Sequence, residues 1–279
     1  MGAGQDAATQ GLRLLLVGCG RMGSAMLGGW LAGPGVTQVA VVEPSARTDA
    51  QDADDRVIRR VDADALPADF VPDVVVLAVK PQMMAAVLPA YRRFVRPETV
   101  FLSVAAGWTL ASFARALGED ARVVRAMPNT PAAIGRGVTV LAAGAGVDDA
   151  QRAACDRLVR AVGSVEWVAD EALIDAVTAL SGSGPAYVFL LAEAMAAAGA
   201  AAGLPADLAD RLARATVAGA GELLRLSPDS AAKLRENVTS PGGTTAAALA
   251  VLMNEQDGFT PLLTKALAAA AERSRQLAQ

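Results

Sequence analysis

The chain has 279 residues, of which 53% are apolar and 4% aromatic, and its formal net charge is −4. This length suits one large domain or two unequal ones, and the charge gives no reason to expect nucleic acid or an anionic membrane as a partner. The sequence has no histidine and only 2 cysteines, which excludes histidine acid/base catalysis, a Ser-His-Asp triad and histidine metal ligands. No metal site is expected.

Residues 1–11 are expected to form a flexible tail, because they contain neither a cationic segment nor the apolar run of a signal peptide. Cys19 and Cys155 lie far apart in the sequence. We expect both to be reduced thiols, which is typical of a cytoplasmic protein.

A glycine-rich segment follows the first predicted strand. Residues 12–17 (LRLLLV) are apolar apart from Arg13, Gly18-Cys19-Gly20-Arg21-Met22-Gly23 comes directly after them, and a small-residue helical pattern covers 24–31. A second strand is predicted at 37–42, which completes a βαβ unit. Glycines allow a tight turn and a close backbone approach, and the helix amino terminus offers N–H groups to a pyrophosphate. The segment therefore predicts a dinucleotide site.

The end of the second strand bears on the choice of cofactor. Glu43 stands there, and an acid at this position accepts hydrogen bonds from the adenine ribose hydroxyls of NADH and repels the 2′-phosphate of NADPH. Ser45 and Arg47 follow closely, and these side chains suit that phosphate. The two signals conflict, so the sequence leaves the choice between NADPH and NADH as cofactor open.

The alternation of strands and helices continues to about residue 168. Further strands are predicted at 73–79, 99–104, 122–126, 137–142 and 164–168, with helices at 82–94 and 148–162. Apolar runs of this kind predict a Rossmann-type, doubly wound, mostly parallel sheet of the α/β class over residues 12–168. Turns at the carboxyl ends of two of these strands are candidate ligand contacts. Their residues are Ala78, Val79, Lys80 and Pro81, and Ala105, Ala106 and Gly107.

Residues 169–279 are predicted to form a separate all-helical domain. The expected helices are 171–180, 184–202, 206–226, 230–237, 244–253 and 260–277. Residues 184–204 are about long enough to span a membrane, but they contain Glu193 and lack flanking basic anchors. We expect a buried helix there and no membrane contact.

A second glycine-rich loop lies between two of these helices. It reads Ser240-Pro241-Gly242-Gly243-Thr244-Thr245. Its backbone N–H groups, its hydroxyls and the dipole of the following helix suit a substrate carboxylate. An ordinary helix–turn–helix with a serine or threonine cap is the alternative.

Together these segments resemble the pyrroline-5-carboxylate reductase family from about Leu12 to Leu277. The likeness is carried by GCGRMG at 18–23, AVKP at 78–81, RAMPNTP at 125–131, DAVTALSGSGPAY at 175–187 and ENVTSPGGTT at 236–245. The resemblance implies reduction of the C=N bond of pyrroline-5-carboxylate to L-proline, the last step of proline biosynthesis. It also implies a homodimer formed through the helical domain, within a higher ring such as a decamer.

The resemblance further assigns roles to particular residues. Asn237 looks like another cofactor ligand, and Glu171 matches a position that binds the proline-like substrate together with Ser240, Gly242, Gly243, Thr244 and Thr245. Glu171 is also the candidate to stabilise or protonate the ring nitrogen. Thr178 is a weaker catalytic candidate, and its alternative is a hydroxyl bonded back to its own helix.

Three other functions compete with this interpretation. A β-hydroxyacid dehydrogenase needs an acid/base such as lysine on the first long helix of its second domain, and residues 171–193 contain neither lysine nor arginine. A reductase of another cyclic imine stays open, because the carboxylate loop does not measure ring size. A non-catalytic dinucleotide-sensing protein would need GCGRMG but not the loop at 240–245.

Overall fold

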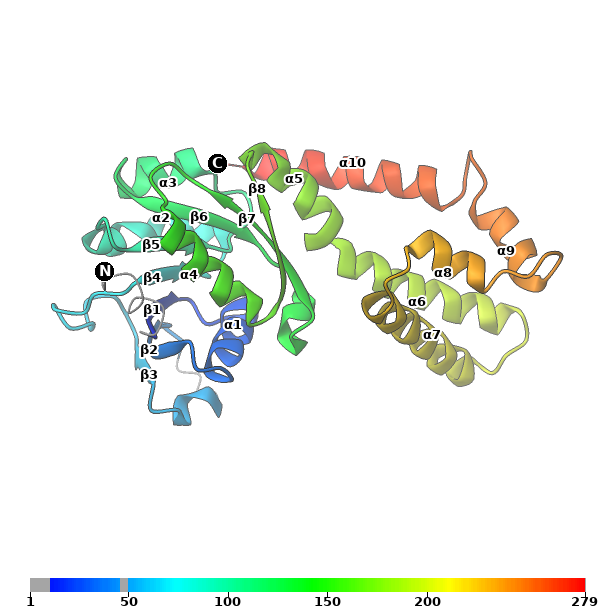
Figure 1. Cartoon of the computed structure of the whole chain (residues 1–279), viewed down its shortest axis with the longest axis horizontal. Coiled ribbons are helices and arrows are strands. Elements are labelled where there is room, and N and C mark those ends of the chain that lie inside the picture. The colour runs from blue at the N-terminus through cyan, green and yellow to red at the C-terminus, as the bar shows by residue number, and fades with distance from the viewer. Residues whose placement is uncertain (1–10, 46–49, 279) are drawn as a thin grey trace, which may run out of the picture. The chain divides into compact units, whose positions relative to one another are not determined.

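A computed structural model describes residues 11–45 and 50–278 (Figure 1). Residues 1–10 of the expected tail, and Arg47, lie outside the described residues. The chain forms two compact units. The first consists of the residues up to Gly182 together with those from Ala271 onward, and the second is Ser183–Ala270. The last strand ends at Val168, so Glu171–Gly182 is helical but belongs to the first unit.

The first unit is built on one 8-stranded sheet with the order β3-β2-β1-β4-β5-β6-β7-β8. Adjacent strands are parallel except β6 and β7, which pair antiparallel. The strands are β1 (Leu12–Val17), β2 (Val36–Val42), β3 (Val57–Arg60), β4 (Val74–Leu77), β5 (Val100–Ser103), β6 (Arg122–Met127), β7 (Gly137–Ala143) and β8 (Gly163–Val168). The predicted mostly parallel α/β sheet is confirmed.

The strand order reverses between β1 and β4, because β2 and β3 lie on one side of this pair and β5 onward on the other. In open parallel sheets, ligands bind at such a reversal, outside the carboxyl ends of the strands. The carboxyl ends of β1, β2, β4 and β5 therefore define where a ligand site is expected.

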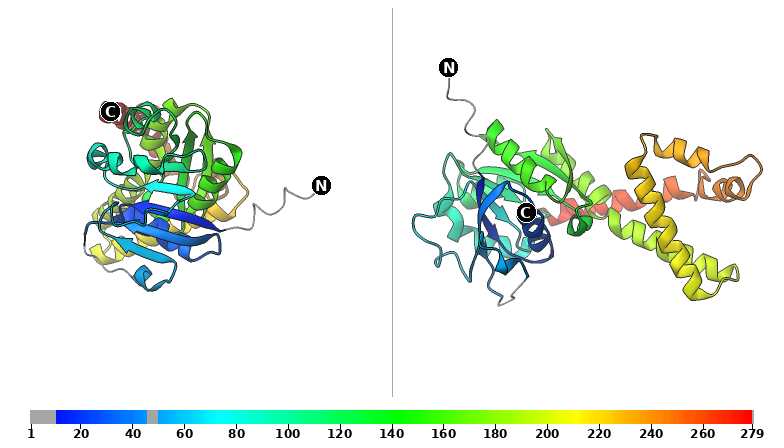
Figure 2. Two further views of the ribbon diagram at one scale, coloured as in Figure 1. Left: turned by 90° about the vertical axis from the view of Figure 1, so that its left-hand side faces the viewer. Right: turned by 60° about the horizontal axis from the view of Figure 1, so that its bottom comes forward.

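Helices cover both faces of this sheet (Figures 1 and 2). They are α1 (Arg21–Leu31), α2 (Met84–Val87), α3 (Leu110–Leu117), α4 (Asp149–Arg160) and α5 (Ile174–Val177). Short 3₁₀ segments are Ala50–Ala53, Pro81–Met83, Leu88–Phe94, Thr130–Ile134 and Glu171–Leu173, and one π turn is Thr178–Gly182.

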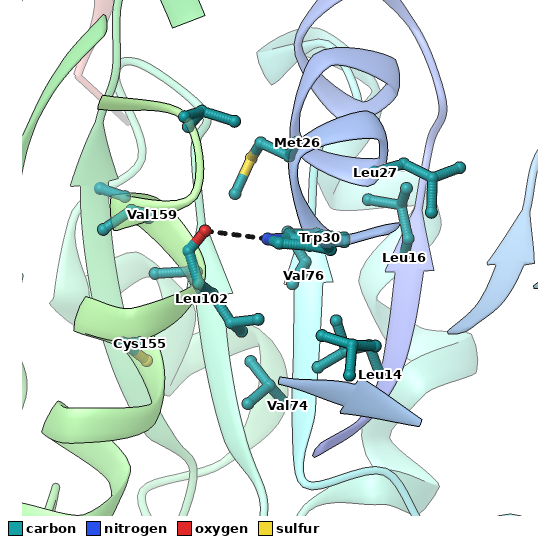
Figure 3. Close-up of a cluster of buried hydrophobic side chains, with 14 of the residues drawn as sticks. Leu14, Leu16, Met26, Leu27, Trp30, Val74, Val76, Leu102, Cys155 and Val159 are labelled. Atoms are coloured by element: carbon teal, nitrogen blue, oxygen red, sulfur yellow. Dashed lines mark hydrogen bonds between the residues drawn. The ribbon is translucent and has the colours of Figure 1, made fainter. Parts of the chain in front are cut away.

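Side chains alternate between two hydrophobic clusters on opposite faces of the sheet. Leu14 and Leu16 of β1 enter the cluster that α1 and α4 cover, whereas Leu15 and Val17 enter the other. In the first cluster the Trp30 indole N–H donates to the Leu158 carbonyl oxygen at 2.9 Å (Figure 3). Burial on both faces explains why residues 14–17 of β1 and the whole of β4 appear in the sequence as unbroken apolar runs.

Three elements of the first unit differ from the sequence prediction. Strand β3 and helix α3 were not predicted; two of the four residues of β3 are Arg59 and Arg60, so it lacks an apolar run. The helix predicted at 82–94 is mostly 3₁₀, because Pro89 has no N–H to continue the α-helical hydrogen bonds of α2.

The second unit is entirely helical, as predicted. Its helices are α6 (Gly184–Ala201), α7 (Ala206–Leu226), α8 (Ala231–Asn237), α9 (Thr244–Leu252) and the first part of α10 (Phe259–Leu277). Helices α6 and α7 approach closely through small residues, since a Cβ on Gly199 would lie 3.3 Å from the Ala209 Cβ.

Helix α6 is not buried within the single chain, so that expectation is wrong for the isolated subunit. Phe189 is 66% exposed and Leu190 61% exposed. Large apolar side chains of α7, α9 and α10 are exposed as well, among them Leu224, Val251 and Leu262. Surface of this kind in a folded protein marks a binding interface.

Candidate functional site

The loop between β1 and α1 and the first turn of α1 together hold three glycines, each needed for a different structural reason. Gly18 has a φ of 87°, and a Cβ there would lie 2.9 Å from Val79 Cγ1. A Cβ on Gly23 would lie 2.4 Å from the Gly18 carbonyl oxygen, whereas a Cβ on Gly20 would meet no atom of residues 11–45 and 50–278 within 4 Å, its chain neighbours aside. The fold therefore requires glycine at 18 and 23, and Gly20 keeps a space open beside the loop.

The amino terminus of α1 offers backbone donors at this open space. The first N–H groups of any helix, here including those of Arg21 and Met22, have no intrahelical acceptor. Gly20 at the N-cap has no side chain that could accept from them. Unpaired N–H groups at a helix amino terminus suit an anion such as a pyrophosphate. The loop thus has the geometry that a dinucleotide requires.

Glu43 lies at the carboxyl end of β2 and is tied to the glycine loop. Its Oε2 accepts a hydrogen bond from the Cys19 N–H at 2.8 Å, and its Oε1 accepts from the Ser45 N–H at 3.1 Å and the Ser45 hydroxyl at 2.9 Å. Burial alone would raise the pKa of Glu43, but these donors and the charge of Arg59 hold the pKa below its ordinary value. The side chain is therefore a carboxylate at neutral pH.

A cavity of about 440 Å³ opens at the carboxyl ends of β1, β2 and β4. It brings together Gly18, Gly20, Glu43, Ala78, Val79 and Lys80 of the predicted cofactor residues. Val61, Met83 and Tyr91 add an apolar wall. A charged rim and an apolar wall suit a nucleotide with its ribose.

A larger hollow, of about 830 Å³, runs along α1 and the segment Thr130–Ile134. Its lining includes Cys19, Gly20, Arg21 and Met22, of which only Gly20 also lines the smaller cavity. It includes no residue from the ends of β2 and β4. The smaller cavity lies at the strand reversal, and we therefore place the candidate nucleotide site there.

The turns after β4 and β5 are joined to each other. The Trp108 indole N–H donates to the Pro81 carbonyl oxygen at 3.0 Å. Gly107 has a φ of 77°, and a Cβ there would lie 2.6 Å from the Leu277 carbonyl oxygen at the end of α10. Glycine at 107 is thus required by its own backbone and by the packing of the C-terminal helix.

Glu171 contacts two groups of the first unit. Its Oε1 lies 2.6 Å from Arg125 Nη1 and accepts a hydrogen bond from the Leu110 N–H at 2.7 Å. The Arg125 side chain is 8% exposed and that of Glu171 27% exposed. The carboxylate therefore neutralises a buried arginine and caps the first turn of α3.

Thr178 and Asn129 are also engaged by nearby backbone. The Thr178 hydroxyl donates to the Ile174 carbonyl oxygen at 2.7 Å, which is the alternative anticipated for it. The Asn129 amide donates to the Ser181 carbonyl oxygen at 3.1 Å and accepts from the Val138 N–H at 3.0 Å. These contacts hold the π turn Thr178–Gly182 against the sheet.

The loop predicted to bind a carboxylate lies in the second unit, together with Asn237 at the end of α8. Gly242 has a φ of 67°, and the Gly243 N–H donates to the Ser240 carbonyl oxygen at 3.0 Å. Helix α9 then begins at Thr244 without a side-chain cap. The backbone donors of Thr244 and Thr245 at this end are therefore available to an anion.

Three residues in these contacts were not predicted as functional. They are Trp108, Arg125 and Asn129. Arg125 gives a signal in the sequence, because a charge inside an otherwise apolar strand needs a buried partner. No local pattern identifies Pro81 as the acceptor for Trp108.

Glu171→Ala tests the buried ion pair. The substitution leaves the Arg125 guanidinium without its partner, and we expect the free energy of unfolding to fall by about 3 kcal/mol in urea titrations. Asp207→Ala is the matched control, because it breaks an exposed pair whose side chains are 73% and 64% exposed and should cost less than about 1 kcal/mol. Equal losses in the two variants would contradict a structural role for Glu171.

Comparisons with known proteins agree with this geometry. The dimerisation-domain model of pyrroline-5-carboxylate reductase matches residues 171–277, and the model described as NADP oxidoreductase, coenzyme F420-dependent, matches residues 13–107. The pyrroline-5-carboxylate reductase of Pseudomonas aeruginosa is 44% identical over 269 residues, which cover 96% of this chain and 97% of that protein.

Solved structures give the same result. A pyrroline-5-carboxylate reductase from Coxiella burnetii superposes with a TM-score of 0.89 at 35% identity, covering 97% of this chain and 100% of that one. A Plasmodium falciparum pyrroline carboxylate reductase with NADP bound gives 0.80 at 27% identity, covering 96% and 98%. The chain belongs to the pyrroline-5-carboxylate reductase family.

Proposed function

We propose that this chain reduces the C=N bond of L-1-pyrroline-5-carboxylate with NAD(P)H and so forms L-proline. The likeness to pyrroline-5-carboxylate reductases over 96% of the chain carries this conclusion. It is supported by a nucleotide-sized cavity in the first unit and by the uncapped helix start at Thr244 in the second.

The residues of the first unit fit the cofactor. The open space beside Gly20 and the uncapped start of α1 suit the pyrophosphate. Glu43 suits the ribose hydroxyls, and Lys80 of the same cavity offers a cation. When bound, the nicotinamide supplies the hydride for the imine carbon. We assign Ala78–Pro81, Ala105–Gly107 and Asn237 to the remaining cofactor contacts.

The loop of the second unit suits the substrate carboxylate. We assign the N–H groups and hydroxyls of Ser240, Gly242, Gly243, Thr244 and Thr245 to this anion. Hydrogen bonds to a charged acceptor are about twice as strong as neutral ones. Together with the helix dipole of α9 they hold the imine without an arginine.

The catalytic roles of Glu171 and Thr178 stay predictions. The Glu171 carboxylate pairs with Arg125, and the Thr178 hydroxyl bonds its own helix. These contacts favour structural roles for both side chains. An iminium is already protonated at nitrogen, so solvent protons suffice for the reaction.

We also propose that a second copy of the chain covers the exposed apolar faces of α6, α7, α9 and α10. The match of residues 171–277 to a dimerisation domain supports this homodimer. Among the described residues, the helical run Glu171–Ala201 has the length and composition to cross a membrane. We propose that a second subunit, and not lipid, covers these apolar faces. We accordingly place the enzyme in the cytoplasm. A ring such as a decamer stays a prediction.

Steady-state oxidation of NADH and of NADPH, followed by absorbance with pyrroline-5-carboxylate supplied, tests the function. We expect turnover. Preference for NADH would indicate that Glu43 governs the choice of cofactor, and preference for NADPH would indicate Ser45 and Arg47. Absence of turnover in protein that still binds NAD(P)H would favour another cyclic imine. A dinucleotide-sensing protein would bind the cofactor and turn over no imine.

Gly20→Val tests the pyrophosphate site. The new side chain enters space that none of the described residues occupies, so we expect an unchanged melting temperature and a loss of NAD(P)H affinity of more than about tenfold in calorimetric titration. Gly23→Ala is the comparison, because its Cβ would clash with the Gly18 carbonyl oxygen and should lower the melting temperature. Retained affinity in Gly20→Val would remove the loop from the cofactor site.

Ser240→Ala combined with Thr245→Val tests the carboxylate loop. Loss of hydrogen bonds to the substrate anion should raise the KM for pyrroline-5-carboxylate by about tenfold or more. The KM for NAD(P)H should stay unchanged, which separates a local effect from misfolding. An unchanged KM for the imine would exclude the loop from substrate binding.

A further inference from the structure

Trp108 lies between the turn Ala105–Gly107 and helix α3. Its side chain is 5% exposed, and its ring packs on Phe113 with the ring centroids 5.3 Å apart. Its indole N–H donates to the Pro81 carbonyl oxygen at 3.0 Å. One side chain thus connects the segment after β5 with the segment after β4.

This connection lies beyond the end of the strand pairing. The register of β4 with β5 ends at Leu77 and Ser103, and the Val104 N–H adds one more bond, to the Leu77 carbonyl oxygen at 3.1 Å. The turns that follow leave the sheet, so their separation depends on contacts other than the ladder. The bond from Trp108 joins them directly.

The far side of the same segment is also fixed. The Leu110 N–H donates to Glu171, which pairs with Arg125. The backbone of Gly107 packs against the Leu277 carbonyl oxygen. These contacts hold both ends of the segment Ala105–Leu110. The hydrogen bond from Trp108 then ties the turn at Lys80 and Pro81 to this segment.

We propose that Trp108 is a positioning residue that sets the spacing of the two turns on which the nicotinamide half of the cofactor rests. The inference rests on the proposed cofactor site. Glu43 marks the ribose end of the crevice at β2, and a dinucleotide that crosses the strand reversal reaches the ends of β4 and β5 with its other half. Trp108 acts on the cofactor through Pro81 and does not itself touch the reacting atoms.

Trp108→Phe tests this role, because it keeps an aromatic ring and removes the N–H donor. Trp30→Phe is the matched control: Trp30 is also buried, and its indole N–H also donates to a backbone carbonyl oxygen, that of Leu158 at 2.9 Å. Trp30 extends from α1 into the core (Figure 3). Both variants lose one buried hydrogen bond, so their melting temperatures should fall by similar amounts.

The readout is the Kd of NADH and of NADPH, measured by titration calorimetry on the full-length protein. We expect Trp108→Phe to raise the Kd of the preferred cofactor by about tenfold and Trp30→Phe to leave it unchanged. In the steady state, the KM for NAD(P)H should rise in Trp108→Phe while the KM for the imine does not. If Trp108→Phe does not fold, Trp108→Met, which fills apolar space and also lacks a donor, is measured in its place with the same expected results.

An unchanged Kd in the folded Trp108 variant, or an equal rise in both tryptophan variants, would overturn the proposal. The titration needs no turnover. A parent protein that binds NAD(P)H but reduces no pyrroline-5-carboxylate would therefore refute the proposed function and still allow this inference to be judged.

Discussion

The tightest constraint in the first unit is the backbone contact where β1 passes into α1. The Gly18 carbonyl oxygen lies where a side chain at position 23 would begin, and Gly18 itself packs on Ala78 and Val79. These contacts bring β1, α1 and the end of β4 together without intervening side chains. The cavity at the strand reversal, the uncapped start of α1 and the bond from Cys19 to Glu43 all depend on this close approach.

The second unit has a different physical basis. Its helices α6 and α7 meet through glycine and alanine, and its larger apolar side chains are exposed in the single chain. Small residues allow close helix packing but bury little apolar area per residue. Such a unit gains stability from association, which is consistent with its match to a dimerisation domain.

Much of the fold followed from the sequence, and the reasons are physical. Strands buried on both faces appear as unbroken apolar runs, which identified β1, β4 and β5, whereas β3 ends in two arginines and was missed. Gly18, Gly20 and Gly23 were recognised by their spacing, but only coordinates separate the open position from the crowded ones. The contacts of Glu171 with Arg125 and Leu110 join segments far apart in the chain, so no local sequence pattern could predict them.

In the proposed reaction, hydride passes from the cofactor to the imine carbon of pyrroline-5-carboxylate. This transfer can be followed by turnover with nicotinamide cofactor deuterated at both C4 positions and mass spectrometry of the product. We expect L-proline carrying one deuterium at the former imine carbon. Proline without deuterium, or oxidation of the cofactor without proline, would contradict it.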